Sequence, residues 1–172
     1  MNNTKSENLK LFYFLKCISS LGDVRIRRIA EKYSKLSELF SIDLLSLKSI
    51  DGISDKTCQE IEQSVNNSNG FEESYLKLLE KLEKSNIKVT TVFDEDYPKN
   101  LRNIYDAPVI LYYYGNLNES DRYSISIVGT RTPSDYGRKI CYEISKELAN
   151  RGMPVISGLA IGIDSIAHNS CL

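Results

Sequence analysis

The sequence has no tryptophan and one histidine among its 172 residues, and its four cysteines form no Cys-x-x-Cys pair. Cys17, Cys58, Cys141 and Cys171 stand 41, 83 and 30 residues apart. A structural zinc site uses closely spaced Cys or His ligands, so this spacing argues against zinc. We expect no metal and no other cofactor, and thiols that serve as partly buried small hydrophobes.

Long hydrophobic runs are also missing. No stretch approaches the roughly 18 apolar residues of a membrane-spanning helix. The N-terminus, MNNTKSENLKLF, has no continuous apolar segment after its lysines, which argues against a signal peptide. We therefore expect a cytoplasmic protein with reduced thiols and no membrane partner.

Neither sign of charge is in excess, because 22 basic residues face 23 acidic ones and the net charge is -1. This balance excludes a nucleic-acid partner held by overall charge, so any polyanion site must be local. Split after residues 70 and 121, the chain carries net charges of +1, -4 and +2, which makes the two ends the better candidates. The hydrophobic and charged fractions, 41% and 26%, are those of an ordinary globular protein with one compact domain or two small ones.

Helical spacing of apolar residues predicts an all-α domain over residues 1–70, with helices near 8–18, 24–33, 37–40 and 43–47. The segment 47–58 resembles the hairpin of a helix-hairpin-helix or SAM-like domain, with Ser54 as the N-cap of its second helix. Backbone N–H groups of such a hairpin can hold a phosphate, but Asp51 and Asp55 flank them, so contacts with DNA and with protein both remain open. The polar run at 66–70 predicts a linker and places a domain boundary after residue 70.

Residues 71–172 have the pattern of an α/β domain. A helix is expected near 72–84, and β-branched or apolar strands near 87–93 and 108–114. A strand at 124–128 then enters a glycine turn and a helix with a predicted core stripe of Tyr136, Ile140, Ile144 and Leu148. A second strand at 153–157 enters another glycine-rich turn and a helix beginning near Ile163. This order predicts a Rossmann-like parallel sheet that is incomplete at its C-terminal side.

The two glycine turns indicate an anion site. Because the carboxyl ends of parallel strands lie at one edge, the N–H groups of both turns can converge there. Gly129 would let a phosphate approach the main chain, Arg131 would supply a planar donor, and Ser157 and Gly158 would close the other side. Singly, Gly129 could be a steric glycine and Arg131 could pair with Asp135.

The sequence gives less support to two other kinds of site, a dinucleotide site and an acid-base or metal site. The spacing Gly129-x-Arg131 departs from the Gly-x-Gly-x-x-Gly fingerprint, and no acidic residue ends the next strand, which disfavours an NAD enzyme. Asp164 and His168 share a helix face, but no third ligand or nucleophile stands at a telling spacing. A structural hydrogen bond between them, supporting the second turn, is the favoured interpretation.

Four motifs, in this order, resemble those of the DNA-processing protein A family, also called DprA or Smf. They are Tyr97-Pro98 with Leu101, Pro108 with Leu111 and Gly115, Ile127-Val128-Gly129-Thr130-Arg131 with Tyr136-Gly137, and Ser157-Gly158-Leu159-Ala160-x-Gly162-Ile163-Asp164-x-x-Ala167-His168. The resemblance covers residues 97–172, and the last two motifs are highly specific. The helical region fits the family's N-terminal domain more loosely.

The resemblance implies a non-catalytic bacterial protein of natural transformation. It would bind incoming single-stranded DNA, protect it from nucleases and help load the RecA recombinase, as a homodimer at full length. Arg131 would be the main phosphate-binding side chain, with Gly129, Thr130, Ser157 and Gly158 lining the same pocket.

Family members continue well beyond the position of Leu172, so we expect these residues to represent the first part of a longer protein. An alternative comes from a different class. The same glycine turn followed by a basic residue is similar to nucleotide phosphoribohydrolases often called lysine decarboxylases, although their downstream Pro-Gly-Gly and catalytic Arg/Glu pair do not occur here.

Overall fold

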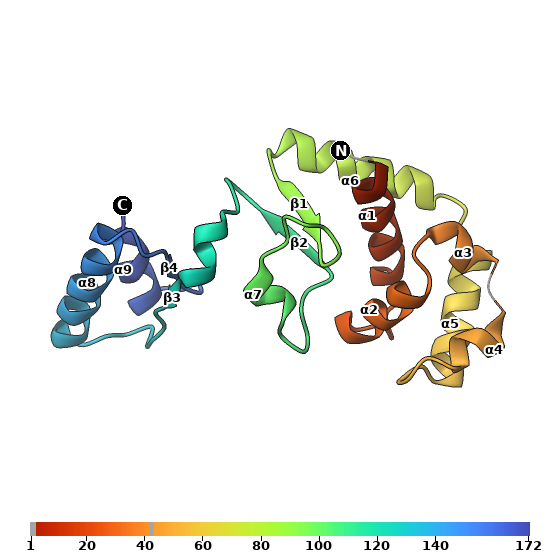
Figure 1. The fold of residues 1–172 in the computed structure, drawn as a ribbon, viewed down its shortest axis with the longest axis horizontal. Coiled ribbons are helices and arrows are strands. Elements are labelled where there is room, and N and C mark those ends of the chain that lie inside the picture. The colour runs from red at the N-terminus through yellow and green to blue at the C-terminus, as the bar shows by residue number, and fades with distance from the viewer. Residues whose placement is uncertain (1–2, 42) are drawn as a thin grey trace. The chain divides into compact units, whose positions relative to one another are not determined.

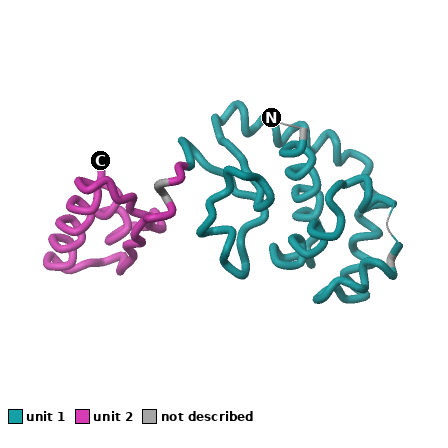
Figure 2. The backbone as a smooth tube through the Cα atoms, viewed as in Figure 1, with its two compact units in different colours: residues 1–117 teal, residues 118–172 magenta. Residues whose placement is uncertain are grey.

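The computed structural model describes residues 3–41 and 43–172 (Figure 1). The chain divides into two compact units, residues 1–117 and 118–172, which are coloured separately in Figure 2. None of the helices in the described residues is both long and apolar enough to cross a membrane. The same residues contain no group of three or more His, Cys, Asp or Glu side chains arranged to hold a metal ion.

Six helices lie at the start of the described part of the first unit. They are α1 (Asn3–Lys16), α2 (Asp23–Lys32), α3 (Leu36–Phe40), α4 (Leu44–Lys48), α5 (Asp55–Asn66) and α6 (Phe71–Lys84). The predicted helical N-terminal region is confirmed, with boundaries within a few residues except at the start of α1. The predicted N-cap is also confirmed, since the Ser54 hydroxyl accepts a hydrogen bond from Thr57 N at 3.2 Å.

Arg28 of α2 holds the turn of the hairpin predicted at 47–58. Arg28 Nη1 donates to the backbone oxygen of Asp51 and pairs with its carboxylate, both at 2.8 Å. Gly52 has φ +83°, and a Cβ built there would lie 3.1 Å from Arg28 Nη1. The turn therefore favours glycine for its backbone angle, and a larger residue would also press on the Arg28 guanidinium.

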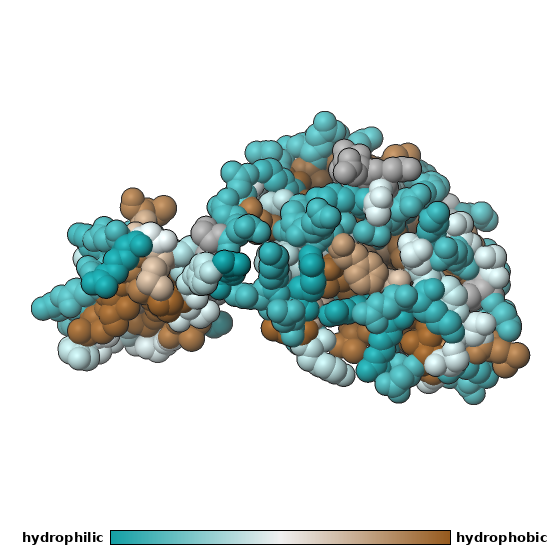
Figure 3. Space-filling model, in the orientation of Figure 1, coloured by the Kyte–Doolittle hydropathy of each residue, from teal (hydrophilic) through white to brown (hydrophobic). Residues whose placement is uncertain are grey.

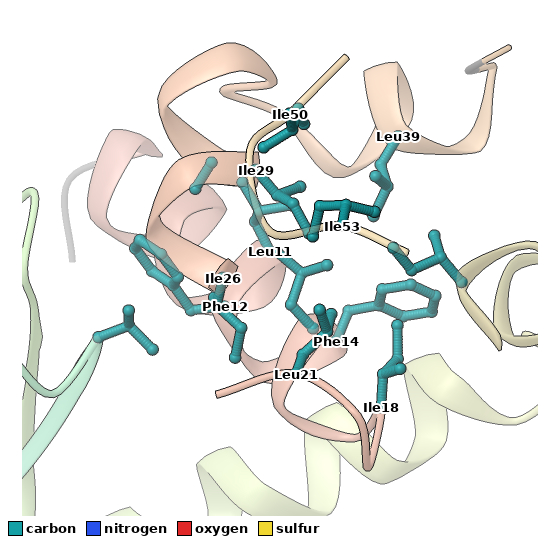
Figure 4. Packing of buried hydrophobic residues seen from close by; sticks show 14 of the residues in the cluster. Leu11, Phe12, Phe14, Ile18, Leu21, Ile26, Ile29, Leu39, Ile50 and Ile53 are labelled. Carbon is teal, nitrogen blue, oxygen red and sulfur yellow. The ribbon is translucent and has the colours of Figure 1, made fainter. Parts of the chain in front are cut away.

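A continuous hydrophobic core joins the helices to the segment that follows them. Leu11, Phe12 and Leu15 of α1 are at most 1% exposed, and Figure 4 shows Leu11 in one cluster with Ile29 and Ile53. The same cluster includes Val92, Tyr97, Ala107 and Val109 from beyond α6. One core thus spans residues 11–109.

That segment contains β1 (Lys88–Thr91), α7 (Lys99–Arg102) and β2 (Ile110–Tyr113). The strands pair antiparallel, with Lys88 opposite Tyr113 and Thr91 opposite Ile110. Strands β1 and β2 therefore form a sheet of their own and do not pair with the later parallel strands. The boundary that the sequence predicts after residue 70 falls inside the first unit, where Tyr75 Oη donates to Ser6 O at 3.2 Å. As a statement about separately folding domains, it stays a prediction.

The second unit contains the 3₁₀ helix η1 (Glu119–Tyr123), β3 (Ile125–Ser126), α8 (Asp135–Asn150), β4 (Val155–Ile156) and α9 (Ile163–Asn169). Strands β3 and β4 pair in parallel, with α8 between them in the chain. This is the strand-helix-strand unit that the sequence predicts. The Ser134 hydroxyl caps α8 by accepting from Gly137 N at 3.2 Å.

The predicted core stripe of α8 is wrong for two of its members, because Tyr136 is 75% exposed and Ile144 is 51% exposed. The buried residues of α8 are Cys141 and Ser145, on the side that contacts α9. There the Cys141 thiol lies 3.5 Å from Ile163 O. Helical spacing marks an apolar face, but the neighbouring element decides which residues are buried.

The prediction for the thiols is confirmed for three of the four cysteines. Cys58 and Cys141 are buried and Cys171 is half-buried, but Cys17 is exposed.

Candidate anion-binding site

The two predicted turns adjoin each other at the carboxyl ends of β3 and β4. Ile163 N, at the start of α9, donates to Thr130 O in the first turn at 3.2 Å. Gly162 has φ +97°, and a Cβ built there would lie 2.4 Å from the same oxygen. Only glycine fits at that position, so Gly162 allows the two turns to meet.

Gly129 is required by the same junction. A Cβ at this residue would lie 2.7 Å from Cγ1 of Ile163 and 2.9 Å from its Cβ. Packing against Ile163 therefore explains why residue 129 is glycine, and the alternative of a steric role for Gly129 is confirmed. Close approach of a phosphate to the same backbone stays a prediction.

Backbone N–H groups without a protein acceptor gather on both turns. Within the described residues, six backbone N–H groups on these turns have no hydrogen-bond acceptor. They belong to Gly129, Thr130 and Arg131 in the first turn and to Leu159, Ala160 and Ile161 in the second. Leu159 has φ +57°, a left-handed conformation that costs a non-glycine residue about 1 kcal/mol or more. Strained backbone with unpaired amides is the usual construction of an anion-binding turn.

Arg131 is exposed, and it has no hydrogen bond or ion pair with any described residue. The rival interpretation, an ion pair with Asp135, is not found there. The Thr130 hydroxyl accepts a hydrogen bond from Thr132 N at 3.1 Å, so this side chain stabilises the turn locally. The guanidinium is therefore available to an external ligand next to the free amides.

Two of the predicted pocket residues use their polar groups internally. The Ser157 hydroxyl donates to Ile127 O at 2.6 Å, and Gly158 N donates to Asp164 Oδ2 at 3.1 Å. A Cβ on Gly158 would lie 2.8 Å from the same carboxylate oxygen. The groups left for an anion are thus on the Gly129–Arg131 turn and the 159–161 segment.

Asp164 holds the second turn in place, while His168 is not its partner. Asp164 is 6% exposed and binds Gly158 N, and no hydrogen bond joins it to His168 among the described residues. His168 Nε2 is buried without a hydrogen-bond partner there. The predicted Asp-His hydrogen bond is therefore wrong, and the predicted support of the turn comes from Asp164 alone.

Sequence reasoning placed Gly162 and Ile163 in the motif of the second turn but gave them no part in joining the two turns. A glycine immediately before a helix was the available signal, because such a position often needs a positive φ. The contact of its neighbour Ile163 with Gly129 is a tertiary one and has no sequence signal.

The sequence is similar to proteins of one known class. Residues 88–172, which include both turns, match the sequence model of the family described as DNA recombination-mediator protein A. Protein Smf of Synechocystis is 33% identical over 159 residues, covering 90% of this chain and 39% of that protein. DNA processing protein DprA of Bacillus subtilis is 36% identical over 104 residues, covering 58% of this chain and 35% of that one.

The fold agrees with a solved member of that class. The X-ray structure of DprA from Streptococcus pneumoniae superposes with a TM-score of 0.68 at 27% identity, over 92% of this chain and 51% of that chain. The chain belongs to the DprA/Smf family. It spans less than half the length of the two curated relatives named above.

Proposed function

We propose that this chain supplies part of a single-stranded DNA-binding surface, which holds phosphates without catalysis and without reading base sequence. The observation that carries the proposal is the set of amides beside the Arg131 guanidinium, all without a partner among residues 3–41 and 43–172. Membership of the DprA/Smf family supports DNA as the polyanion. The Rossmann-like arrangement proposed for the complete sheet would place further strand ends along the same edge.

The chemistry of such a site is electrostatic. Backbone N–H groups at fixed positions and a planar guanidinium donate to phosphate oxygens in charge-assisted hydrogen bonds, each stronger than a neutral one. The site residues we assign are Gly129, Thr130 and Arg131, with Ser157 and Gly158 shaping the opposite wall. Because Ser157 and Gly158 bond within the protein, their part is to position the second turn.

For the whole protein, we propose that bound single strands are protected and passed to the RecA recombinase in natural transformation and homologous recombination, with a homodimer as the working form. These roles follow from the family resemblance, and a cytoplasmic location fits them.

The test is the variant Arg131→Ala, with Arg151→Ala as the matched control. Arg151 follows the other end of α8 and pairs with Glu147 at 2.7 Å. We expect Arg131→Ala to weaken binding of a labelled oligothymidylate about tenfold, as befits one lost charge-assisted bond. It should also make the slope of log affinity against log salt shallower by about 0.7. Fluorescence anisotropy across a salt series measures both quantities.

Equal affinity and an equal slope for Arg131→Ala and the parent chain would overturn the assignment of the site. The enzyme alternative has its own measurement, which is release of free base from nucleoside monophosphates. Turnover that Arg131→Ala abolishes would replace the DNA-binding proposal with phosphoribohydrolase activity.

A further inference from the structure

A groove in the first unit lies far along the chain from the turns of the candidate anion site. It has a volume of about 540 Å³ and lies where the ends of α1, α5 and α6 meet. Its lining residues belong to these three helices and to the loops after α1 and α5. None of them is Lys, Arg or His.

The helix ends around the groove favour a positive charge. The last turns of α1 and α5 contribute Phe14, Gln63 and Ser64 to the lining, and a helix C-terminus carries a partial negative charge. The N-terminus of α6 also reaches the groove, but Glu72 and Glu73 lie in its first turn and offset its positive end.

Glu60 adds a full negative charge to this lining. Its Oε2 atom is buried and has no hydrogen-bond partner among the described residues. A buried carboxylate oxygen without a donor is costly, and a cationic donor would remove that cost. The nearest basic residue in sequence to the α1 side of the groove, Lys16, is engaged by Asp23 at 3.1 Å.

Apolar side chains complete the lining. Phe14 and Phe71 contact each other edge to face, with ring centroids 5.1 Å apart, and Ile18 lies beside them in the groove. The polar groups of Ser19, Asn67 and other lining residues surround this apolar part. A ligand that matches both features has an aliphatic stem and a cationic head, as Lys and Arg side chains do.

We propose that this groove binds a basic side chain, Arg or Lys, presented by a partner polypeptide, with its cationic head on Glu60 and its stem on Phe14 and Phe71. The hydroxyl and amide groups around the groove can bond the backbone that carries the side chain. The proposal is independent of DNA binding, because it uses none of the residues of the glycine turns.

The experiment titrates the ¹⁵N-labelled chain with the blocked tripeptide Ala-Arg-Ala, and with Ala-Gln-Ala as the uncharged probe. Backbone amide shifts should saturate at Ser19, Gln63, Ser64 and Asn67 with the arginine peptide only. Glu60→Gln should weaken that binding at least tenfold. Glu62→Gln is the matched control, since Glu62 is exposed on the same helix outside the groove, and it should bind like the parent chain.

Equal loss in the Glu60→Gln and Glu62→Gln variants would overturn the role of Glu60. Equal binding of the arginine and glutamine peptides to the parent chain would overturn the proposal even if Glu60→Gln failed to fold. Agmatine carries a guanidinium without a peptide backbone, so it distinguishes a small free cation from a side chain presented by a polypeptide. If agmatine bound as tightly as the tripeptide, a partner polypeptide would be the wrong occupant. Arg131→Ala should leave all of these titrations unchanged.

Discussion

The two units of the chain differ in how completely they bury their apolar side chains. In residues 1–117 the core includes Phe12 and Ile26 at 0% exposure, and it runs from α1 to the strand segment. In the described part of residues 118–172 the buried apolar side chains are those of Pro133, Cys141 and Ala167. Larger apolar residues there face solvent, and Figure 3 shows hydrophobic surface on this unit.

The exposed residues of the second unit follow its two strands and its long helix. Val128 is 73% exposed and Ile156 is 49% exposed, and Ile144 of α8 is similarly open. Parallel sheets are normally covered on both faces, so exposed apolar residues on these strands leave part of the sheet uncovered within this unit. The comparison teaches that the first unit closes its core within these residues, while the glycine turns sit on a unit whose strands have open faces.

The largest expected effect tests this contrast directly. Phe12→Ala removes a ring that is 0% exposed and lies 5.2 Å from the ring of Phe93, so it should cost about 3–5 kcal/mol of unfolding free energy. Ile144→Ala, on the open face of α8, should change stability by no more than about 0.5 kcal/mol. Urea denaturation followed by circular dichroism measures both. A cost for Ile144→Ala close to that of Phe12→Ala would show that the face of α8 is covered in solution.

A smaller effect is expected at the junction of the two turns. Gly162→Ala combines a strained φ with a Cβ that would lie 2.4 Å from Thr130 O, and it should cost about 1–3 kcal/mol. The loss should be confined to the second unit, as hydrogen exchange of its backbone amides would show. The control is Gly137→Ala, where a Cβ meets Ser134 Oγ at an ordinary 3.5 Å and helix propensity improves by about 1 kcal/mol. Unchanged exchange around residues 129–131 in Gly162→Ala would mean that the turns are not joined through this glycine.

The parts of the fold that depend on local sequence were predictable. Apolar spacing placed α1, α2 and α8, and the Ser54 cap followed from one residue type before a helix. The buried side of α8 was not predictable, because α9 covers Cys141 and Ser145 and leaves Tyr136 open. The pairing of β1 with β2 likewise depends on which strands meet in space, and neither strand carries that information alone.

The candidate site shows the same division. Alternating strands and glycine turns correctly predicted that the segments at 129–131 and 157–162 would adjoin. The sequence could not show that Gly158 N would bond Asp164, which removes one predicted donor from the anion. It also could not show that Arg131 would have no ion-pair partner in the part of the chain that the structure describes, since that depends on side-chain positions across the turn.

The smallest effect concerns an ion pair that stabilises the first unit alone. Lys5 Nζ lies 2.7 Å from Asp96 Oδ2, and Thr90 donates to the same carboxylate at 2.8 Å. Burial alone would raise the pKa of Asp96, but the hydrogen bonds from Lys5 and Thr90 outweigh it, so its pKa is lowered. The hydrogen bond with Asp96 raises the pKa of Lys5 despite its partial burial.

These directions define a pH window for the pair. A lowered carboxyl pKa stabilises the fold above the unfolded value, about 4, and the benefit is lost as pH falls through the folded pKa. A raised lysine pKa stabilises the fold below about pH 10, and this stabilisation is lost as pH rises through the folded pKa.

Asp96→Asn should therefore lower stability at pH 7 by less than about 1 kcal/mol, since both side chains are partly exposed, and by less still in acid. Urea midpoints of the parent chain and of Asp96→Asn, at pH 7 and in acid, measure this loss of stability. Asp106→Asn, at an exposed position, is the control. An equal loss at both pH values would show that the ion pair does not contribute and that only the Thr90 hydrogen bond matters.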